Sequence, residues 1–194
     1  MRLVRSTPIR LLAYFVLVLI VATVVGWRLF SRSKSKASNA SPDETRISET
    51  SFRLTLPGKW TSGPSNDPTR RQYYTGSENL TVSIHGSLFG TPNAMSSDDK
   101  MARFAYWVRK RRDAEAEALQ DNTIRITEPQ FGEFGGVLAA RYAGFDEARR
   151  RRFHCLLLAS SSAFEVFYYE AVDMTEQAAE LRAKAIFNSV DIPK

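Results

Sequence analysis

The longest uninterrupted apolar segment of the chain runs from Leu11 to Trp27 and contains no charged residue. Its 17 residues are at the short end of the range that a membrane-spanning helix needs, about 17–25 residues. Arg10 and Arg28 bound the segment and can extend their charges to the lipid headgroups, and Trp27 lies where interfacial tryptophan is common. The pattern predicts a transmembrane signal anchor at 11–27, preceded by a basic head at 1–10. Arg10, Trp27 and Arg28 are its membrane-interface residues.

Two other interpretations of this segment stay open. The basic head also suits a cleaved signal peptide, although small residues do not follow the apolar run directly and the nearest candidate site is Ser38–Ala40. A buried helix of a soluble protein is the third interpretation. Lys and Arg nearly balance on the two flanks, so charge does not set the orientation. A short head before a large C-terminal domain favours a domain outside the cytoplasm, in the periplasm or extracellular space.

Beyond residue 50, apolar positions alternate with polar ones, which is the period of half-buried strands. The alternation predicts strands at 51–56 and 80–85 and a shorter one at Ile124 and Ile126, and we expect further strands at 70–75, 137–145, 153–159 and 163–171. In the strand 163–171, one face carries Phe164, Val166 and Tyr168 and the other carries Glu165, Phe167 and Tyr169. A strand that is apolar on both faces is expected in the middle of a covered sheet.

Two helices interrupt and close this series of strands. Ser96 with Asp99 matches a capping box and predicts a helix to about Leu119, with an apolar stripe through Phe104 and Val108. Asp173 with Glu176 predicts a cap for a last helix, which ends near Asn188. Short connections favour antiparallel neighbours. We therefore expect an α+β fold with a single antiparallel sheet covered by helices, an α/β/α sandwich, preceded by one transmembrane helix.

The order of segments gives a domain plan. Residues 28–50 are rich in Ser, Lys and small side chains without apolar periodicity, and they predict a basic, Ser-rich linker. Residues 51–194 then form one globular domain, which is long enough to bury a core. The single cysteine, Cys155, cannot form an internal disulfide.

Charge is distributed unevenly between these parts. The chain has 27 Lys and Arg against 21 Asp and Glu, a net charge of +6. Residues 1–40 hold seven of the cations and no acid, which leaves 20 cations against all 21 acids in the remainder. The domain is therefore close to neutral, and the sequence argues against a nucleic-acid partner. We expect the lipid bilayer to be one partner, through Leu11–Trp27, and a protein of unknown identity to be another.

The sequence shows no cluster that predicts catalysis. It contains two histidines, His85 and His154, and His154 precedes Cys155 in a strand, where adjacent side chains point to opposite faces. Without a His or Cys cluster we expect neither a metal site nor a cofactor. Asp98 and Asp99 fit a helix start better than a metal pair. A hydrolase with an unrecognised site, using His85 or His154, remains an alternative.

Two basic runs are candidates for partner binding. On the first helix, the run 109–112 is followed by acids, so the pairs Arg109–Asp113 and Arg111–Glu115 are expected. The second run, 149–152, lies in a hairpin, where alternation sends Arg150 and Arg152 to one face and the other two arginines to the opposite face. Four side chains are therefore our candidates for partner binding: Arg109, Arg111, Arg150 and Arg152.

Three segments resemble the PsbP-like family: the opening FRLTLPGKW, the central FGEFGGVLAARYAGF and the closing AIFNSVDI. That family includes the extrinsic PsbP protein of photosystem II, a Ran-binding nuclear import factor and bacterial membrane-tethered members of unknown role. The resemblance covers Ser51 to Ile192 and implies a PsbP-like fold. It also implies a non-enzymatic binding or assembly module, or alternatively a cytoplasm-facing adaptor for a regulatory protein such as a GTPase. No site residue of the family can be matched to a position in this chain.

Overall fold

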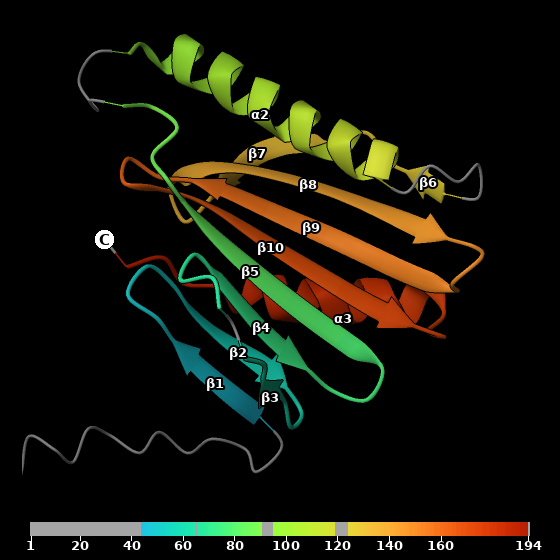
Figure 1. Cartoon of the computed structure of the whole chain (residues 1–194). Helices are drawn as coiled ribbons and strands as arrows, with labels where there is room; N and C mark the ends of the chain where they lie inside the picture. Colours follow the sequence, from blue (N-terminus) through green and yellow to red (C-terminus); the bar gives the residue numbers. More distant parts are fainter. Residues whose placement is uncertain (1–43, 65, 91–94, 119–123, 194) are drawn as a thin grey trace, which may run out of the picture. The chain divides into compact units, whose positions relative to one another are not determined.

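An antiparallel sheet with a helix on each face forms the folded part of the chain (Figure 1). The computed structural model describes residues 44–64, 66–90, 95–118 and 124–193, all within one compact unit, Asp43–Lys194. The expected anchor Leu11–Trp27, with Arg10 and Arg28, lies outside the described residues. Among the helices that are described, none is long and apolar enough to cross a membrane.

The elements follow one another in the order strand, strand, strand, strand, strand, helix, then five strands and a last helix. Their bounds are β1 Glu44–Ser48, β2 Arg53–Pro57, β3 Thr61–Ser62, β4 Arg70–Tyr74, β5 Glu78–Gly86, α2 Ser97–Ala118, β6 Ile124–Ile126, β7 Gln130–Phe134, β8 Val137–Asp146, β9 Arg151–Ala159, β10 Ala163–Val172 and α3 Glu176–Asn188. The α+β class, the antiparallel pairing and the two helices are as the sequence predicts.

The strands form two sheets, so the expectation of a single sheet was wrong. Eight strands form the larger sheet in the order β3-β4-β5-β10-β9-β8-β6, with β7 also paired to β8, while β1 and β2 form a separate pair. The reason is that both edges of β2 are occupied. One edge pairs with β1, and the other exchanges backbone hydrogen bonds between Arg53 and Asp191 in the C-terminal segment, at 2.8 Å each. No edge of β2 is left for the larger sheet.

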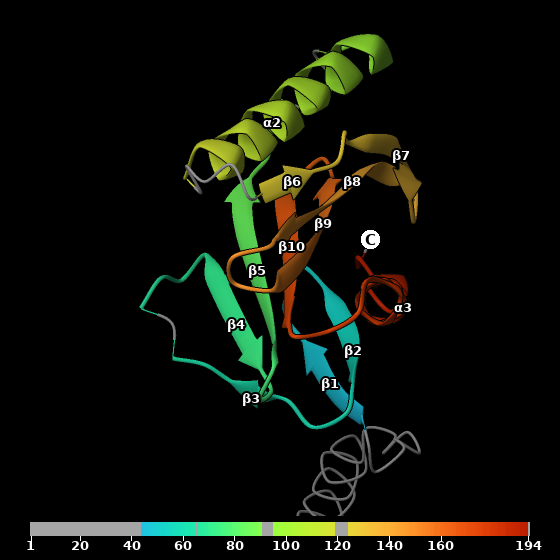
Figure 2. The same cartoon turned by 90° about the vertical axis from the view of Figure 1, so that its right-hand side faces the viewer.

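Each face of the large sheet has its own apolar core. Figure 2 shows α2 on one side of this sheet and α3 on the other. The core on the α3 side combines β2, the sheet and α3, and Phe52, Phe167 and Ile186 are fully buried in it. The core on the α2 side is built around Phe104 and Phe153, which are also fully buried. The strand β10 contributes to both cores and lies between β5 and β9, so its predicted central position is confirmed.

Each of the two helices begins directly after a capping residue. The Asp99 backbone N–H donates to Ser96 Oγ at 3.2 Å, which confirms the predicted cap of α2. The cap of α3 is Thr175, whose hydroxyl accepts from the Ala178 N–H at 3.3 Å, and not Asp173. Asp173 instead adopts a positive φ of 58° and forms an ion pair of 3.0 Å with Arg150, which has a positive φ of 50°.

Three strands lie where the sequence predicts none: β1, the two-residue β3 and β7. The strand β1 falls inside residues 28–50, the predicted linker, so the folded domain begins at least as early as Glu44. The strand β7 contains Gly132, and the turn that follows this strand is made by Gly135 and Gly136 at positive φ of 60° and 83°.

Candidate functional site

A groove runs between α2 and the β5 side of the sheet. On the α3 side, β5 buries Leu80 and Val82, but its α2 side carries Thr81, Ser83 and His85. The helix α2 contacts β6 and β8 and does not cover this polar face. A cavity of about 550 Å³ opens beside the helix and is lined by His85, Leu88, Trp107, Lys110, Arg111, Ala114, Glu115 and Phe164. This volume lies in the range of ligand pockets.

The cavity continues along β5 into two smaller hollows of about 350 and 270 Å³. All three are lined by Glu115, and the two smaller hollows also share Arg70, Thr81 and Tyr168. We call the three together the α2 groove. The smallest hollow ends at Arg151 and Glu170.

Glu115 is the central polar group of the α2 groove. Its Oε1 accepts a hydrogen bond from Arg111 Nε at 3.1 Å, and its Oε2 accepts one from the Tyr142 hydroxyl at 2.8 Å. Burial raises the pKa of the Glu115 carboxyl, and the bonds from Tyr142 and Arg111 oppose that rise. The carboxylate is thus held in place by protein groups, which makes it a structural part of the groove wall.

The histidines and the cysteine do not form a catalytic group. His85 lies in the groove beside the Phe164 ring, with ring centroids 6.0 Å apart, and burial followed by the charge of Arg111 lowers its pKa. His154 lies on the α3 side of the sheet beside Tyr169, with ring centroids 6.3 Å apart. Cys155 belongs to the opposite core, as alternation predicts, and burial raises the pKa of its thiol well above the usual value. A buried, protonated thiol is unreactive.

No group of three or more His, Cys, Asp or Glu side chains that could hold a metal ion occurs in the described part of the chain. Asp98 and Asp99 lie in the first turn of α2, where their negative charges interact favourably with the positive end of the helix dipole.

The four arginines expected at a partner site are separated by the fold. Arg111 lines the α2 groove and makes the predicted pair with Glu115. The expected pair of Arg109 with Asp113 is replaced by other contacts. The Arg109 guanidinium lies 5.7 Å from the centroid of the Phe131 ring, and Asp113 pairs with Arg112 at 3.0 Å.

The second pair of arginines lies at the start of α3. Arg152 donates a hydrogen bond to the Met174 carbonyl at 3.1 Å, and its guanidinium lies 4.0 Å from the centroid of the Phe145 ring. Arg150 pairs with Asp173. Both side chains support the connection between β10 and α3, so the structure gives them local partners.

A surface that the sequence analysis missed borders the groove. Arg103, Tyr106, Trp107 and Lys110 are exposed neighbours on one side of α2, and we call them the α2 stripe. Tyr106 is 59% exposed and Trp107 37%, with their rings in edge contact at 5.8 Å, and Lys110 Nζ lies 5.1 Å from the Trp107 ring. The sequence does indicate this surface, because Tyr106 and Trp107 are large aromatic residues that do not lie on the helix face of the buried Phe104 and Val108.

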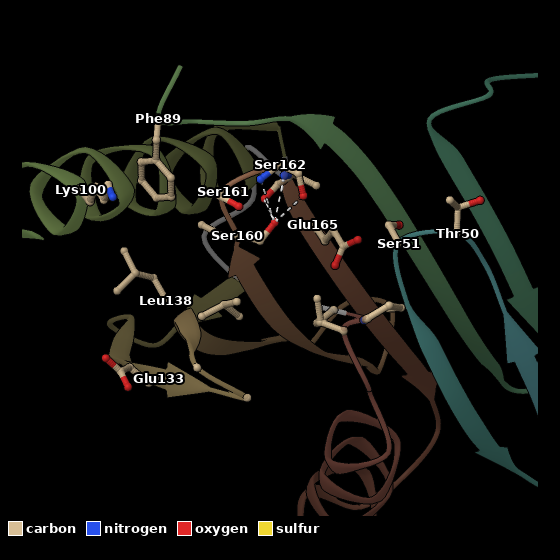
Figure 3. A pocket seen from close by; sticks show the side chains of 17 residues that line it. Thr50, Ser51, Phe89, Lys100, Glu133, Leu138, Ser160, Ser161, Ser162 and Glu165 are labelled. Atoms are coloured by element: carbon tan, nitrogen blue, oxygen red, sulfur yellow. Dashed lines mark hydrogen bonds between the residues drawn. The ribbon is translucent and has the colours of Figure 1, made fainter. Parts of the chain in front are cut away.

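A second cavity, the Glu165 pocket, lies at the start of β10, beside the Ser160–Ser162 turn (Figure 3). It has a volume of about 690 Å³. Its walls come from the Ser160–Ser162 turn, the hairpin at Gly135 and Gly136, the segment before β2 and the C-terminal segment. Glu165 is only 3% exposed, and burial raises the pKa of its carboxyl. The nearby Ser51 hydroxyl opposes that rise without reaching hydrogen-bond geometry.

Comparison with known proteins identifies the fold. No family model matches the sequence, and no curated protein is similar to it. Among solved structures, the cyanobacterial PsbP of Synechocystis superimposes with a TM-score of 0.60 at 12% identity, over 82% of this chain and 98% of that one. The described domain is therefore a layered α+β domain of known type, and its fold is PsbP-like, as the sequence predicts.

Two further structures show weaker similarity. A protein from Bacteroides thetaiotaomicron matches with a TM-score of 0.43 at 9% identity, over 74% of this chain and 45% of that one. LpqN of Mycobacterium tuberculosis, described as involved in cell envelope biogenesis, matches with a TM-score of 0.41 at 11% identity, over 82% of this chain and 88% of that one.

Proposed function

We propose that this protein is a single-pass membrane-anchored, non-enzymatic binding or assembly module that presents its PsbP-like domain at a membrane surface. The apolar segment Leu11–Trp27 with its flanking arginines supports the anchor. The near-neutral domain that follows supports a partner other than nucleic acid. The domain lies outside the cytoplasm, because a short basic head before a large domain is typical of this orientation.

The observation that carries the binding role is the α2 stripe beside the α2 groove. Tyr106 and Trp107 are exposed in contact with each other, next to cationic Arg103 and Lys110. Exposed Trp, Tyr and Arg next to a cavity are typical of the residues that dominate protein interfaces. Their charge favours a protein partner with acidic side chains around an apolar site.

Crosslinking from defined positions tests this role. A photoreactive amino acid replaces Trp107 in the full chain in its native membrane, and a second chain carries it at Leu181 on α3. Leu181 is a matched control because it is a large apolar side chain that is 61% exposed. We expect one discrete crosslinked protein species from position 107 and none of that species from position 181. Equal yields of that species from both positions would contradict the proposal.

Substitution then measures the strength of the contact. We expect Trp107→Ala to weaken binding of the crosslinked partner at least about tenfold, as truncation of a central aromatic residue does, and Leu181→Ala to leave it within about twofold. Arg150→Ala is a second control, because Arg150 is paired with Asp173 away from the stripe.

A reporter tests the location. Alkaline phosphatase fused after Lys194 is expected to be active in intact cells if the domain lies outside the cytoplasm. An inactive fusion that is nonetheless produced at full length would place the domain in the cytoplasm and favour the adaptor role instead.

A further inference from the structure

Two buried polar atoms lie without hydrogen-bond partners at one wall of the Glu165 pocket. Among the described residues, neither Glu165 Oε1 nor Ser51 Oγ has a hydrogen-bond partner. Figure 3 shows the Glu165 carboxyl group extending toward the side of the pocket on which Ser51 lies. A buried polar atom left unpaired costs about 1–3 kcal/mol, and a hydrogen-bonding ligand in the pocket would relieve that cost.

The position of Glu165 is built into the strand. Its neighbours Phe164 and Val166 belong to the core under α2, so alternation sends the Glu165 side chain to the other face of β10. There it lies near the pocket lining from Ile192 and Pro193 of the C-terminal segment. Rotation of a carboxylate about its last side-chain torsion is soft, so either oxygen can face the pocket.

The lining sets the chemical class of the ligand. At this wall a carboxylate and a hydroxyl together accept hydrogen bonds from a donor that carries positive charge. The cation of the lining, Lys100 on α2, lies apart from Glu165 and Ser51 in Figure 3. Val137, Leu138 and Ile192 supply apolar wall for an alkyl chain. The pocket brings no third acidic or histidine group to Glu165 that would complete a metal site in the described residues. An ammonium group on an alkyl stem meets each of these conditions.

We propose that the Glu165 pocket binds a primary alkylamine, whose ammonium donates hydrogen bonds to the Glu165 carboxylate and the Ser51 hydroxyl while its alkyl stem packs on Val137 and Ile192. The ligand is either a free amine or the side chain of a lysine. This site is separate from the α2 groove and does not depend on the proposed function.

Calorimetric titration of the detergent-solubilised full chain tests the site. The probes are cadaverine as a free amine, Nα-acetyl-lysine methylamide as a lysine side chain, and 1,5-pentanediol as an uncharged control of the same length as cadaverine. We expect at least one amine to bind with a dissociation constant below about 1 mM, and the diol to bind at least about tenfold more weakly. Binding of cadaverine alone identifies a free amine, and binding of the lysine probe identifies a lysine.

Variants connect the binding to the two unpaired atoms. We expect Glu165→Gln to weaken amine binding at least about tenfold and Ser51→Ala about two- to fivefold. Glu117→Gln is the matched control, because Glu117 is an exposed glutamate of α2 that does not line the pocket, and we expect it to change binding less than about twofold.

Three results would overturn the proposal: equal binding of the diol, an unchanged affinity in Glu165→Gln, or no binding of either amine by the folded chain below about 1 mM. Near-ultraviolet circular dichroism checks the fold of each variant. If Glu165→Gln fails to fold, Glu165→Asp serves in its place, because it keeps the negative charge but withdraws the carboxylate from the ligand by one methylene group. We expect Glu165→Asp to bind amines more weakly than the wild type does, but still to prefer them over the diol.

Discussion

At the scale of single residues, Glu78 shows how one side chain connects distant elements. It lies at the start of β5, is 8% exposed, and accepts hydrogen bonds from the Tyr169 hydroxyl and from Arg182 Nε, both at 2.8 Å. A second Arg182 nitrogen reaches its other oxygen at 3.1 Å. The carboxylate therefore joins β5, β10 and α3.

Loss of this carboxylate has a large expected effect on stability. We expect Glu78→Ala to lower the free energy of unfolding by about 2–3 kcal/mol, because it leaves the Tyr169 hydroxyl buried without its acceptor and removes the partner of a partly exposed Arg182. Chemical denaturation measures the change. Glu117→Ala, at an exposed position of α2, is the control and should stay within about 0.5 kcal/mol of wild type. Equal effects of the two substitutions would contradict this role.

Replacement of the Glu165 carboxyl group is expected to raise the stability of the fold at high pH, whereas loss of the Glu78 carboxylate lowers it. Burial raises its pKa in the folded state above the unfolded value of 4.5. Its stabilising contribution is fully present below pH 4.5 and is lost as the pH rises through the folded-state pKa. We therefore expect Glu165→Gln to withstand more denaturant than wild type at pH 8, with the difference shrinking towards pH 4. Unfolding curves at both pH values measure it, and a difference that grows towards low pH would contradict the prediction.

The sequence contained a partial signal for this carboxyl group. Alternation placed Glu165 on a face with Phe167 and Tyr169 in a strand predicted to be covered on both sides, so a buried acid followed from the pattern. What the pattern could not supply is the partner geometry. Ser51 precedes β2 and approaches Glu165 only because β2 packs in the layer of α3, which is a tertiary contact. The same limit explains why Glu115 was expected to pair with Arg111 but not with Tyr142.

At the scale of elements, the hairpin of β8 and β9 depends on a missing side chain. Gly144 is the register partner of Phe153, and the fully buried Phe153 ring lies directly over it. A Cβ atom at Gly144 would overlap that ring. The aromatic ring thus fills the space that the glycine leaves in the strand, and it stacks on Tyr168 of β10 with ring centroids 5.4 Å apart.

Two glycines in paired strands allow a matched test of this packing. We expect Gly144→Ala to lower the free energy of unfolding by about 2 kcal/mol, because Phe153 must leave its position in a packed core. Gly132→Ala in β7 meets no atom within 4 Å and should change stability by less than about 0.5 kcal/mol. Thermal unfolding of both variants measures the effect. A Gly144→Ala variant as stable as Gly132→Ala would show that the ring moves freely.

Strands were predictable where many apolar residues lie in one long segment. The central strands β5, β8, β9 and β10 are nine or ten residues long, carry several apolar residues each and were predicted within a few residues. The strand β1 was missed because it has a single apolar residue, Ile47, at the end of a polar segment. The strand β7 was missed because it is short and contains Gly132, a residue type that is uncommon in strands. Both are edge strands whose formation depends on a neighbour rather than on their own pattern.

At the scale of the whole molecule, β1 determines where the domain starts. Ile47 packs against the core on the α3 side, and the Thr45 hydroxyl donates to the Gly58 carbonyl at 2.9 Å and accepts from the Trp60 N–H at 3.0 Å. These contacts fix the turn after β2. Residues that composition assigns to a linker therefore belong to the folded domain.

Substitutions in β1 test this boundary. We expect Ile47→Ala to lower the free energy of unfolding by about 1 kcal/mol, since it removes partly buried apolar surface. Arg46→Ala changes an exposed side chain of the same strand and should have an effect within about 0.5 kcal/mol. If both variants matched the wild type, residues 44–48 would behave as linker.

The pairing of β2 with the C-terminal segment has a consequence for the order in which the protein is made. Thr55 bonds to Ser189 across 134 positions of sequence, and among the described residues the second edge of β2 is covered by a segment that is synthesised after α3. Contacts between such distant residues slow folding. While the chain emerges, the core around Phe52, Leu54 and Leu56 stays incomplete until α3 has been synthesised. The newly made domain therefore needs protection from aggregation until α3 and the segment that follows it have been synthesised.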